Sequence, residues 1–517
     1  MYSFRFIQRT VTVGSQLWRT KSIDRLLEES EAPEKKLRKT LGVWSLTALG
    51  IGAVIGTGIF VLTGTAAAGE QVAYPSIFKA PLLQVLLHGS DAVGVSGRPG
   101  AGPAIALSFF LVAVVCGFAA LCYAELASMI PIAGSAYTYT YATLGELVAW
   151  IIGWDLILEY AVSNMAVGVG FSAYLTNLLG SFGIHLPPHL SSPAYTPAGG
   201  WALNFNLPGF LIVMFVTMLL LKGIRESAGA NNVMVGIKVA AILIFVFAAL
   251  EYVQPSNWRP FMPNGWQGVL TGGAIVFFTY IGFDSVSTAA EECKNPKRDM
   301  PLGIIFTLGI CATLYIAVAV VLTGIQHYST FLGEAAPVAK ALAALNLPNV
   351  QRVVTIGALT GMLSSLLVYQ YGQTRVWYAM SRDRLLPDVF SSVHPKTRVP
   401  HISTWVAGIL VGIPSGLLDI GTLADLSSIG TLFAFVLVSI SVMILRKTQP
   451  DRPRGFRVPM VNIIAPLSVL SCLVLMMSLT VENWVRFVVW LAIGLAIYFL
   501  YGRHRSELRN GAGAGRG

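Results

Sequence analysis

The chain has 517 residues, of which 55% are hydrophobic and only 12% are charged, and its mean hydropathy is +0.67. A soluble domain carries roughly 25% charged residues, so this composition excludes an ordinary soluble enzyme. The formal net charge of +10 is typical of a membrane protein with basic cytoplasmic loops, and it favours contact with anionic membrane lipid while giving no indication of nucleic-acid binding.

Residues 1–40 mix Arg, Lys and Glu without the apolar core and cleavage site of a signal peptide. This pattern predicts a cytosolic N-terminal arm. With the N-terminus inside, most Lys and Arg residues fall in the tails and the cytoplasmic loops, as the positive-inside rule requires. We therefore expect a multi-pass protein of the cell (inner or plasma) membrane with both termini cytoplasmic, and residues 502–517 would form the C-terminal tail.

Twelve apolar stretches are long enough to cross a bilayer, because about 20 residues match its hydrocarbon thickness. They begin near Ser45, Pro103, Leu147, Pro208, Val233, Gly268, Gly303, Val353, Ile402, Thr422, Ile464 and Trp484. The sequence therefore predicts an all-α polytopic membrane protein with about twelve transmembrane helices. The third stretch exceeds what a perpendicular span needs, so we expect it to tilt or to project beyond the bilayer.

The first stretch contains an apolar segment rich in glycine, from Gly50 to Phe60. A helix that breaks inside a membrane leaves backbone groups unpaired, and this is tolerated only where water, an ion, a substrate or protein satisfies them. The segment therefore predicts a polar binding site at membrane depth. Helix packing is the alternative reading, because Gly52 and Gly56 also form a small-xxx-small motif.

The outer loop that follows, residues 69–102, contains glycine and proline and a short apolar piece from Ala80 to Leu87. We favour a solvated loop, with a piece lying along the membrane surface as the alternative. The sixth stretch is also interrupted, at Gly282 and Asp284. Paired interruptions in two halves indicate an inverted-repeat transporter whose site lies near the midplane. Residues 41–445 would form the ten-helix core, and residues 446–501 the last two helices.

From about Lys39 to Tyr501 the chain resembles the amino acid, polyamine and organocation transporter superfamily, and most closely its cationic amino acid transporter family. The motifs that carry the resemblance are Gly52 to Phe60, Tyr123 to Leu126, Pro131 to Tyr137, Tyr280 to Asp284, Glu291 to Pro296, Gly372 to Arg375 and Tyr378 to Asp383. The resemblance implies a LeuT-like 5+5 inverted repeat with helices 1 and 6 broken. It also implies a permease that moves L-amino acids by alternating access, with neither enzymatic activity nor a cofactor.

An amino acid carries a carboxylate and an ammonium group, which suit the free N–H groups and the free carbonyl groups at half-helix ends. The resemblance implies a carboxylate contact at Thr57 and Gly58, ammonium contacts at the carbonyl groups of Ile55, Phe278, Thr279 and Ile281, and an aromatic gate at Phe283.

Lys238 lies in the fifth stretch, and it has two interpretations. A lysine near a helix end can extend its ammonium group to the membrane surface. An intramembrane ionisable residue is otherwise a functional candidate, and a lysine at this place in some relatives lies between spans one and eight. We favour a role in proton coupling. Ser364 and Ser365 in the eighth stretch leave a sodium site open.

Side-chain selectivity rests on two residues. Glu159 in the third stretch would either meet a cationic substrate or pair with a neighbouring helix. The resemblance puts Met362 in the side-chain pocket, where a thioether suits aliphatic better than guanidinium side chains, although a lone Met more often serves packing. We therefore favour a broad neutral L-amino acid specificity, with arginine or lysine transport and amino acid exchange as alternatives. Glu125, Glu291 and Glu292 are interpreted as structural or gating residues.

The five cysteines show no CxxC spacing, and the spans contain no His-Glu-xx-His motif, so the sequence predicts no metal site, no disulfide framework and no enzyme. The expected partners are an L-amino acid, protons and membrane lipid, and a small membrane protein partner stays open. A receptor that binds an amino acid without moving it would use the same pocket, and only a flux measurement separates the two.

Overall fold

The computed structural model describes residues 16–31, 39, 41–70, 76–89, 91–92, 98–132, 134–196, 200–222, 224–395 and 399–507. Most of the expected N-terminal arm, part of the outer loop 69–102 and most of the C-terminal tail 502–517 lie outside these residues.

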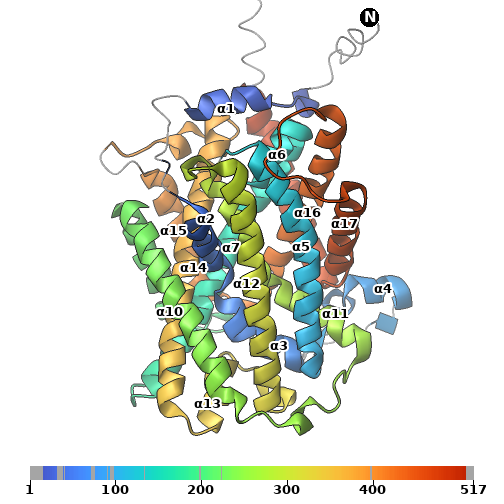
Figure 1. Ribbon diagram of the computed structural model, residues 1–517. Coiled ribbons are helices and arrows are strands. Elements are labelled where there is room, and N and C mark those ends of the chain that lie inside the picture. The colour runs from blue at the N-terminus through green and yellow to red at the C-terminus, as the bar shows by residue number, and fades with distance from the viewer. Residues whose placement is uncertain are drawn as a thin grey trace, which may run out of the picture.

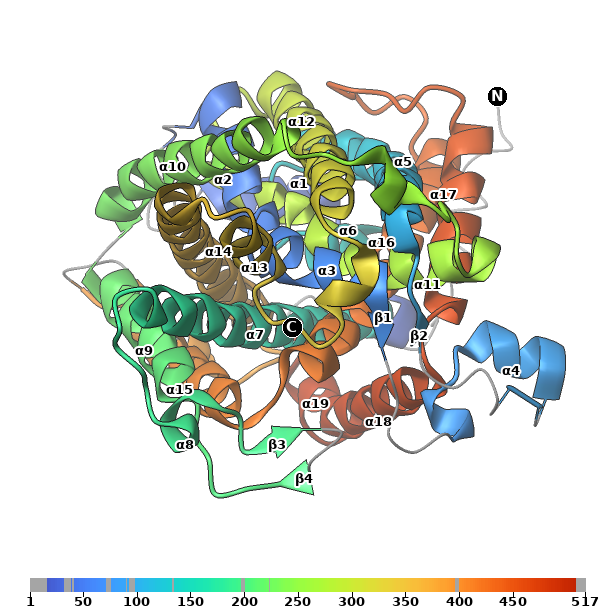
Figure 2. The same cartoon turned by 90° about the horizontal axis from the view of Figure 1, so that it is seen from below.

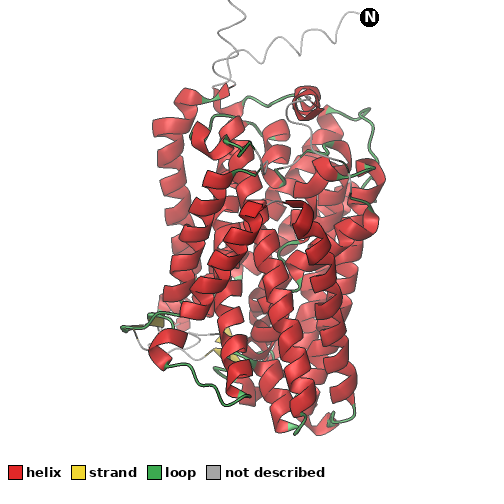
Figure 3. Cartoon of the chain, turned by 90° about the vertical axis from the view of Figure 1, so that its left-hand side faces the viewer, coloured by secondary structure: helices red, strands yellow, loops and turns green. Residues whose placement is uncertain are grey.

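The described chain is a bundle of helices that run between two opposite faces (Figures 1 and 3). Its longer helices are α2 (Val43–Val54), α5 (Ile105–Met129), α7 (Glu146–Gly180), α9 (Leu207–Lys222), α10 (Ile224–Leu250), α11 (Gly265–Val276), α12 (Pro296–Ile325), α14 (Pro348–Arg382), α15 (His401–Leu417), α16 (Ile420–Thr448), α17 (Val461–Met477) and α18 (Val481–Ile497). Its shorter helices are α1 (Ile23–Glu31), α3 (Thr63–Ala68), α4 (Leu82–His88), α6 (Ala136–Thr143), α8 (Pro188–Ser191), α13 (Pro337–Ala344) and α19 (Arg503–Arg505).

Among the described residues, eight helical segments are long and apolar enough to cross a membrane, and the bent pair of α2 and α3 raises the number to nine. Three more apolar helices, α9, α15 and α17, have 16 or 17 residues. The prediction of an all-α polytopic membrane protein is confirmed, because a helix satisfies its own backbone in lipid. The exact count of twelve spans and the inverted repeat stay predictions.

The length expected for the third stretch is also observed. Helix α7 has 35 residues, which corresponds to about 52 Å at 1.5 Å per residue. The hydrocarbon core of a bilayer is about 30 Å thick, so α7 must tilt or extend past it.

Helices α2 and α3 lie inside the bundle. Helix α2 packs against α10, α12 and α14, and α7 packs against α14 and α16. Seen along the bundle axis, α3 is near the centre, with α7, α12 and α14 around it (Figure 2). The first apolar stretch is therefore enclosed by protein on its sides, as a broken helix in a membrane requires.

The two ends of the described chain meet on one face of the bundle. Lys21, just before α1, forms ion pairs with Glu507 (3.3 Å) and with Asp383 (2.9 Å) at the end of α14. We call the face that carries residues 16–31 and 503–507 the terminal face. Two ends on the same face require an even number of membrane crossings.

The outer loop is anchored to the bundle at two places. Strand β1 (Gly69–Glu70) pairs antiparallel with β2 (Arg98–Pro99), with Gly69 opposite Pro99. The Arg98 guanidinium donates to the Glu70 carboxylate at 2.6 Å. The start and the end of the loop are thus tied together. A second short ladder joins β3 (Tyr195–Thr196) and β4 (Gly200–Trp201) on the side of the bundle opposite the helix α1 (Figure 2).

The apolar piece of this loop forms α4, and the structure corrects the expectation of a plain solvated loop. The amide group of Leu82 donates to the carbonyl oxygen of Leu479 (2.9 Å), in the turn between α17 and α18. Leu86 and Leu87 on α4 remain largely exposed. Contact of this helix with the membrane surface therefore stays a prediction.

Candidate functional site

The first break lies between α2 and α3. Helix α2 ends at Val54, Ile55 has an extended backbone, and a π-helical turn from Gly58 to Leu62 leads into α3. The two halves are bent by 44°. The glycine-rich segment is thus an interrupted helix, as its composition predicted.

The second break follows α11. After Val276 a 3₁₀ turn covers Phe277–Tyr280, Ile281 is extended, and Gly282 has a φ of +116°. That backbone conformation favours glycine, because a Cβ atom would clash there. A 3₁₀ helix from Phe283 to Glu292 continues toward the terminal face.

The two breaks touch each other at Gly58 and Thr279. A Cβ atom on Gly58 would lie 2.6 Å from the Cγ2 atom and 2.8 Å from the Cα atom of Thr279. The absence of a side chain at Gly58 is therefore needed for this contact. Gly52 and Gly56 likewise approach Asn231 and Ser365 closely, so close packing, the alternative reading, accounts for these glycines in this conformation.

Tyr315 of α12 joins the two breaks by a hydrogen-bond bridge. Its hydroxyl oxygen lies 2.8 Å from the carbonyl oxygen of Val54 and 2.8 Å from that of Thr279. Tyr369 of α14 donates to the carbonyl oxygen of Ile281 (2.8 Å). These hydroxyl groups satisfy backbone oxygens that each break frees. Sequence reasoning missed both tyrosines, although a hydroxyl in the middle of an apolar stretch must find a partner.

Lys238 of α10 is completely buried and points to the first break. Its Nζ atom donates to the carbonyl oxygens of Gly52 and Ile55, at 2.8 Å each, and lies 3.5 Å from Ser364 Oγ. An ammonium group held by backbone oxygens cannot extend to the membrane surface. The alternative of a snorkelling lysine is therefore wrong for this conformation.

Two serines and an asparagine complete the surroundings of the Lys238 ammonium. Ser365 donates to the carbonyl oxygen of Gly52 (2.8 Å) and approaches that of Ile55 (3.2 Å). Ser364 donates to the side chain of Asn231 (2.7 Å). Carbonyl and hydroxyl oxygens are also the ligands that a bound alkali cation would need. Here the Lys238 ammonium group lies among these oxygens instead.

Most of the predicted substrate contacts lie together at the breaks. Thr57, Phe278, Thr279 and Ile281 are each at most 3% exposed, and Ile55 is completely buried. The carbonyl oxygen of Ile55 already accepts from Lys238 (2.8 Å), and Ser365 Oγ lies 3.2 Å from it.

The Ile55 carbonyl group therefore serves Lys238 rather than a substrate in this conformation. The hydroxyl group of Thr57 has no hydrogen-bond partner among the described residues.

Phe283 and Met362 lie next to the breaks. The Phe283 ring contacts Tyr123 and Phe435, with ring centroids 6.0 and 5.0 Å apart. Met362 is completely buried, and its neighbour Gly361 contacts the side chain of Lys238. Both positions are compatible with the predicted gate and side-chain pocket.

Glu159 lies away from the carboxylate end of the predicted site. Thr57 packs against Gly170 of α7, and Glu159 lies eleven residues before Gly170, or roughly 16 Å along the helix. Its acidic neighbours are instead Asp155 and Asp284. Tyr160 donates to Asp284 (3.3 Å).

These three carboxyl groups form a buried cluster between the second break and the terminal face. Their oxygens are buried, and apart from the Tyr160 contact they have no hydrogen-bond partner in the described part of the chain. Sequence reasoning considered Glu159 as a side-chain contact and Asp284 as part of the second interruption, but it did not consider Asp155, which lies four residues before Glu159 on the same helix face.

The glutamates expected near the cytoplasmic face hold helix ends together. Glu125 accepts two hydrogen bonds from Arg446, at 2.7 Å each, and one from the amide group of Val458 (2.7 Å). Glu292 accepts from Tyr371 (2.9 Å). These contacts agree with a structural role.

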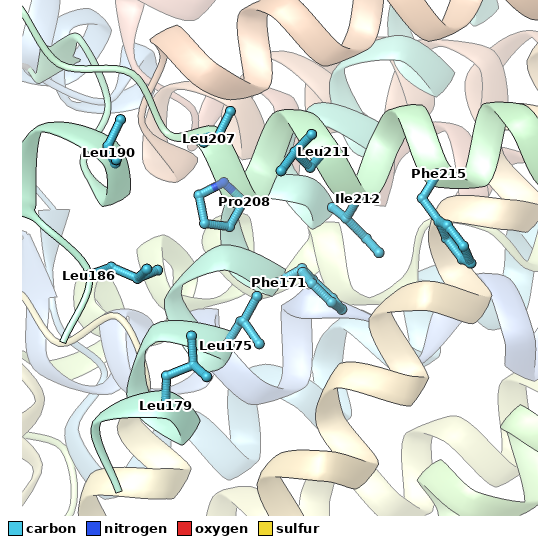
Figure 4. A pocket seen from close by; sticks show the side chains of 10 residues that line it. All are labelled: Phe171, Leu175, Leu179, Leu186, Leu190, Leu207, Pro208, Leu211, Ile212 and Phe215. Atoms are coloured by element: carbon cyan, nitrogen blue, oxygen red, sulfur yellow. The ribbon is translucent and has the colours of Figure 1, made fainter. Parts of the chain in front are cut away.

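A cavity of about 410 Å³ lies elsewhere, between α7 and α9 (Figure 4). The side chains that line it are those of Phe171, Leu175, Leu179, Leu186, Leu190, Leu207, Pro208, Leu211, Ile212 and Phe215. A cavity without polar groups offers nothing to a carboxylate or an ammonium group. It is therefore not the site formed by the breaks.

Known permeases and transporters match most of the chain. A family model described as amino acid permease matches residues 41–500. The chain is 47% identical to the branched-chain amino acid permease BcaP of Bacillus subtilis, over 95% of this chain and 99% of that protein. It is 44% identical to a methylthioribose transporter of the same organism, over 96% and 99%. A vacuolar cationic amino acid transporter of Arabidopsis thaliana is 35% identical, over 84% and 68%.

Proposed function

Because this chain belongs to the amino acid permease family, we propose that it is a secondary active transporter that moves L-amino acids across the cell membrane by alternating access. The contact between the two helix breaks at Gly58 and Thr279 is the observation that carries the proposal. An amino acid bound between the two half-helix ends would separate them, so binding is linked to movement of the broken helices. Both termini would lie in the cytoplasm.

Coupling to protons is the second part of the proposal. The buried ammonium group of Lys238 bridges two carbonyl oxygens of the first break. Loss of its proton would remove the positive charge and one of its three N–H donors, which would weaken the hydrogen bonds to both oxygens and loosen the hold on the broken helix. Because an ammonium group and a metal cation would compete for the same oxygens, this arrangement supports proton rather than sodium coupling.

A broad neutral specificity is the third part. The apolar Met362 supports it, and a permease named for branched-chain amino acids is 47% identical to this chain. Cationic amino acids remain the alternative, because three buried carboxyl groups, including Glu159, lie between the second break and the terminal face.

A second candidate substrate follows from a different relative. The methylthioribose transporter covers nearly the whole chain at 44% identity. Methylthioribose has neither a carboxylate nor an ammonium group, so it would need hydroxyl partners instead. Methylthioribose is therefore one of the substrates in the uptake test.

The test is uptake by the purified protein in sealed proteoliposomes, with and without an inward proton gradient and in the absence of sodium. The panel contains leucine, isoleucine, valine, alanine, arginine, lysine and methylthioribose. We expect acid-stimulated accumulation of neutral amino acids. Binding without flux would identify a receptor, uptake only with internal amino acid would identify an exchanger, and uptake that required sodium would contradict proton coupling.

A further inference from the structure

A small polar cavity lies at the terminal face, remote from the two breaks. Its volume is about 250 Å³. It is lined by the side chains of Arg384, Asp388, Tyr501, His504 and Arg505. The first two come from the turn after α14, and the other three from the end of the last membrane helix, so the cavity joins two segments far apart in the sequence.

Close packing of the two segments holds the cavity together. A Cβ atom on Gly502 would lie 3.4 Å from the carbonyl oxygen of Leu385, so the end of the last helix rests directly on the turn. The hydroxyl group of Ser381 donates to the carbonyl oxygen of Pro387 (2.7 Å) and fixes the other side of that turn.

The cavity carries a positive charge. Arg384 and Arg505 are permanently protonated, and Asp388 supplies one negative charge against them. The Arg384 guanidinium group forms neither a hydrogen bond nor an ion pair with another described side chain. A guanidinium group presents paired donors that match the oxygens of a phosphate group.

The cavity opens at the edge of the bundle, where lipid lies. Helices α18 and α19 are at the periphery when the bundle is viewed along its axis (Figure 2). Leu500, next to the cavity residue Tyr501, is 81% exposed. An apolar side chain this exposed faces acyl chains, and the arginines that follow reach the headgroup level.

We propose that this cavity binds a phosphate group, supplied by the headgroup of an anionic phospholipid at the membrane surface. Arg384 and Arg505 hold the phosphodiester oxygens. The Asp388 carboxylate opposes a second negative charge and accepts a hydrogen bond from a headgroup hydroxyl. The site therefore suits a singly charged glycerol phosphodiester better than doubly charged inorganic phosphate.

The test measures thermal unfolding of the purified full-length chain in detergent, with added phosphatidylglycerol, phosphatidylcholine or inorganic phosphate. We expect phosphatidylglycerol to stabilise the protein more than phosphatidylcholine does. Arg384→Gln and Arg505→Gln should each weaken this effect by about tenfold in lipid concentration, because each removes charge-assisted hydrogen bonds to the phosphate oxygens. Arg384→Lys, which keeps the charge, should weaken it less.

Arg503→Gln is the matched control. Its guanidinium group lies over the Phe499 ring, 6.0 Å from the centroid, and does not line the cavity. This variant should keep the phosphatidylglycerol effect. An unchanged effect in both Arg384→Gln and Arg505→Gln, or an equal loss in Arg503→Gln, would overturn the site. Equal stabilisation by inorganic phosphate that depended on Arg384 would keep the phosphate site and overturn its assignment to lipid.

Discussion

The ammonium group of Lys238 lies 2.8 Å from the carbonyl oxygen of Ile55, the residue at which the first half-helix ends. This contact connects a titratable side chain on α10 to the backbone of the broken helix. A change in its protonation would thus act on the half-helix end directly. Through this contact, gain or loss of the Lys238 proton would be coupled to movement of the broken helix.

Replacement of Lys238 by Met keeps the length and apolar stem of the side chain and removes its proton. We expect Lys238→Met to abolish acid-stimulated uptake into proteoliposomes while the protein remains folded, because the two carbonyl oxygens lose a donor that depends on protonation. Lys222→Met, at an exposed lysine at the end of α9, is the control and should be silent. Equal acid stimulation in wild type and Lys238→Met would rule out Lys238 as the coupling residue.

A side chain at Gly58 should force the two breaks apart. We expect Gly58→Ala to lose transport and to lower stability by about 1–3 kcal/mol, the usual range for overpacking, and Gly58→Val to do both more strongly. Binding and thermal unfolding of the purified variants are the measurements. Gly309 on α12 has no neighbour within 4 Å of its Cβ position, so Gly309→Ala is the control and should leave transport unchanged. Wild-type affinity in Gly58→Val would contradict the assignment of the site.

The hydroxyl group of Tyr315 should stabilise the contact between the breaks. In Tyr315→Phe the carbonyl oxygens of Val54 and Thr279 lose the one hydroxyl proton that lies between them. The Val54 oxygen still accepts from the amide group of Gly56 (3.0 Å), so we expect the cost of one unsatisfied group, about 1–3 kcal/mol. We expect a lower melting temperature together with altered substrate affinity. Tyr498→Phe removes a hydroxyl that donates to Glu146 (2.9 Å), far from the breaks, and should affect stability alone. If both variants kept wild-type affinity, the bridge would be structural only.

The breaks could be predicted because their signals are local. Glycines within an apolar stretch indicate an interrupted helix, and Gly282 in the second break has the backbone conformation that glycine favours. The partners of the freed carbonyl groups could not be predicted. Tyr315 and Tyr369 reach them from other helices, and such a contact depends on how the helices pack rather than on any periodicity. The placement of Lys238 against Gly52 and Ile55 required the same knowledge, although its depth in the membrane already marked it as a functional candidate.

Met362 is predicted to line the side-chain pocket and so to influence substrate selectivity. Met362→Ser enlarges the predicted side-chain pocket and adds a hydroxyl group, so uptake should shift toward larger or cationic amino acids. Because Met362 is completely buried, the variant should also lose about 2–5 kcal/mol of stability. Uptake in the presence of competing amino acids is therefore measured well below the melting temperature of the variant. Met380→Ser, at another buried methionine on α14, should lose stability without changing the rank order. The same rank order in wild type and Met362→Ser would assign Met362 to packing.

The terminal face provides the last prediction, at Lys21. Its ammonium group pairs with Asp383 at 2.9 Å, and their side chains are only 1% and 5% exposed. Asp383 also accepts from the hydroxyl group of Tyr137 (2.6 Å), so the pair ties the segment before α1 to the ends of α14 and α6. Lys21→Met leaves the Asp383 carboxylate buried without its cation, which costs about 3–5 kcal/mol. We expect a clearly lower melting temperature.

Asp24 offers the matched control, because it pairs with Arg452 on the same face but its side chain is 76% exposed. An exposed pair contributes no more than about 1 kcal/mol, so Asp24→Asn should unfold near the wild-type temperature. Partial rescue of Lys21→Met by Asp383→Asn, which removes the stranded charge, would identify the buried ion pair as the cause. If Lys21→Met and Asp24→Asn unfolded at the same temperature, the Lys21 pair would contribute no more than a surface contact, and the docking of the N-terminal segment would have to rest on its apolar side chains, such as the buried Ile23 and Leu26.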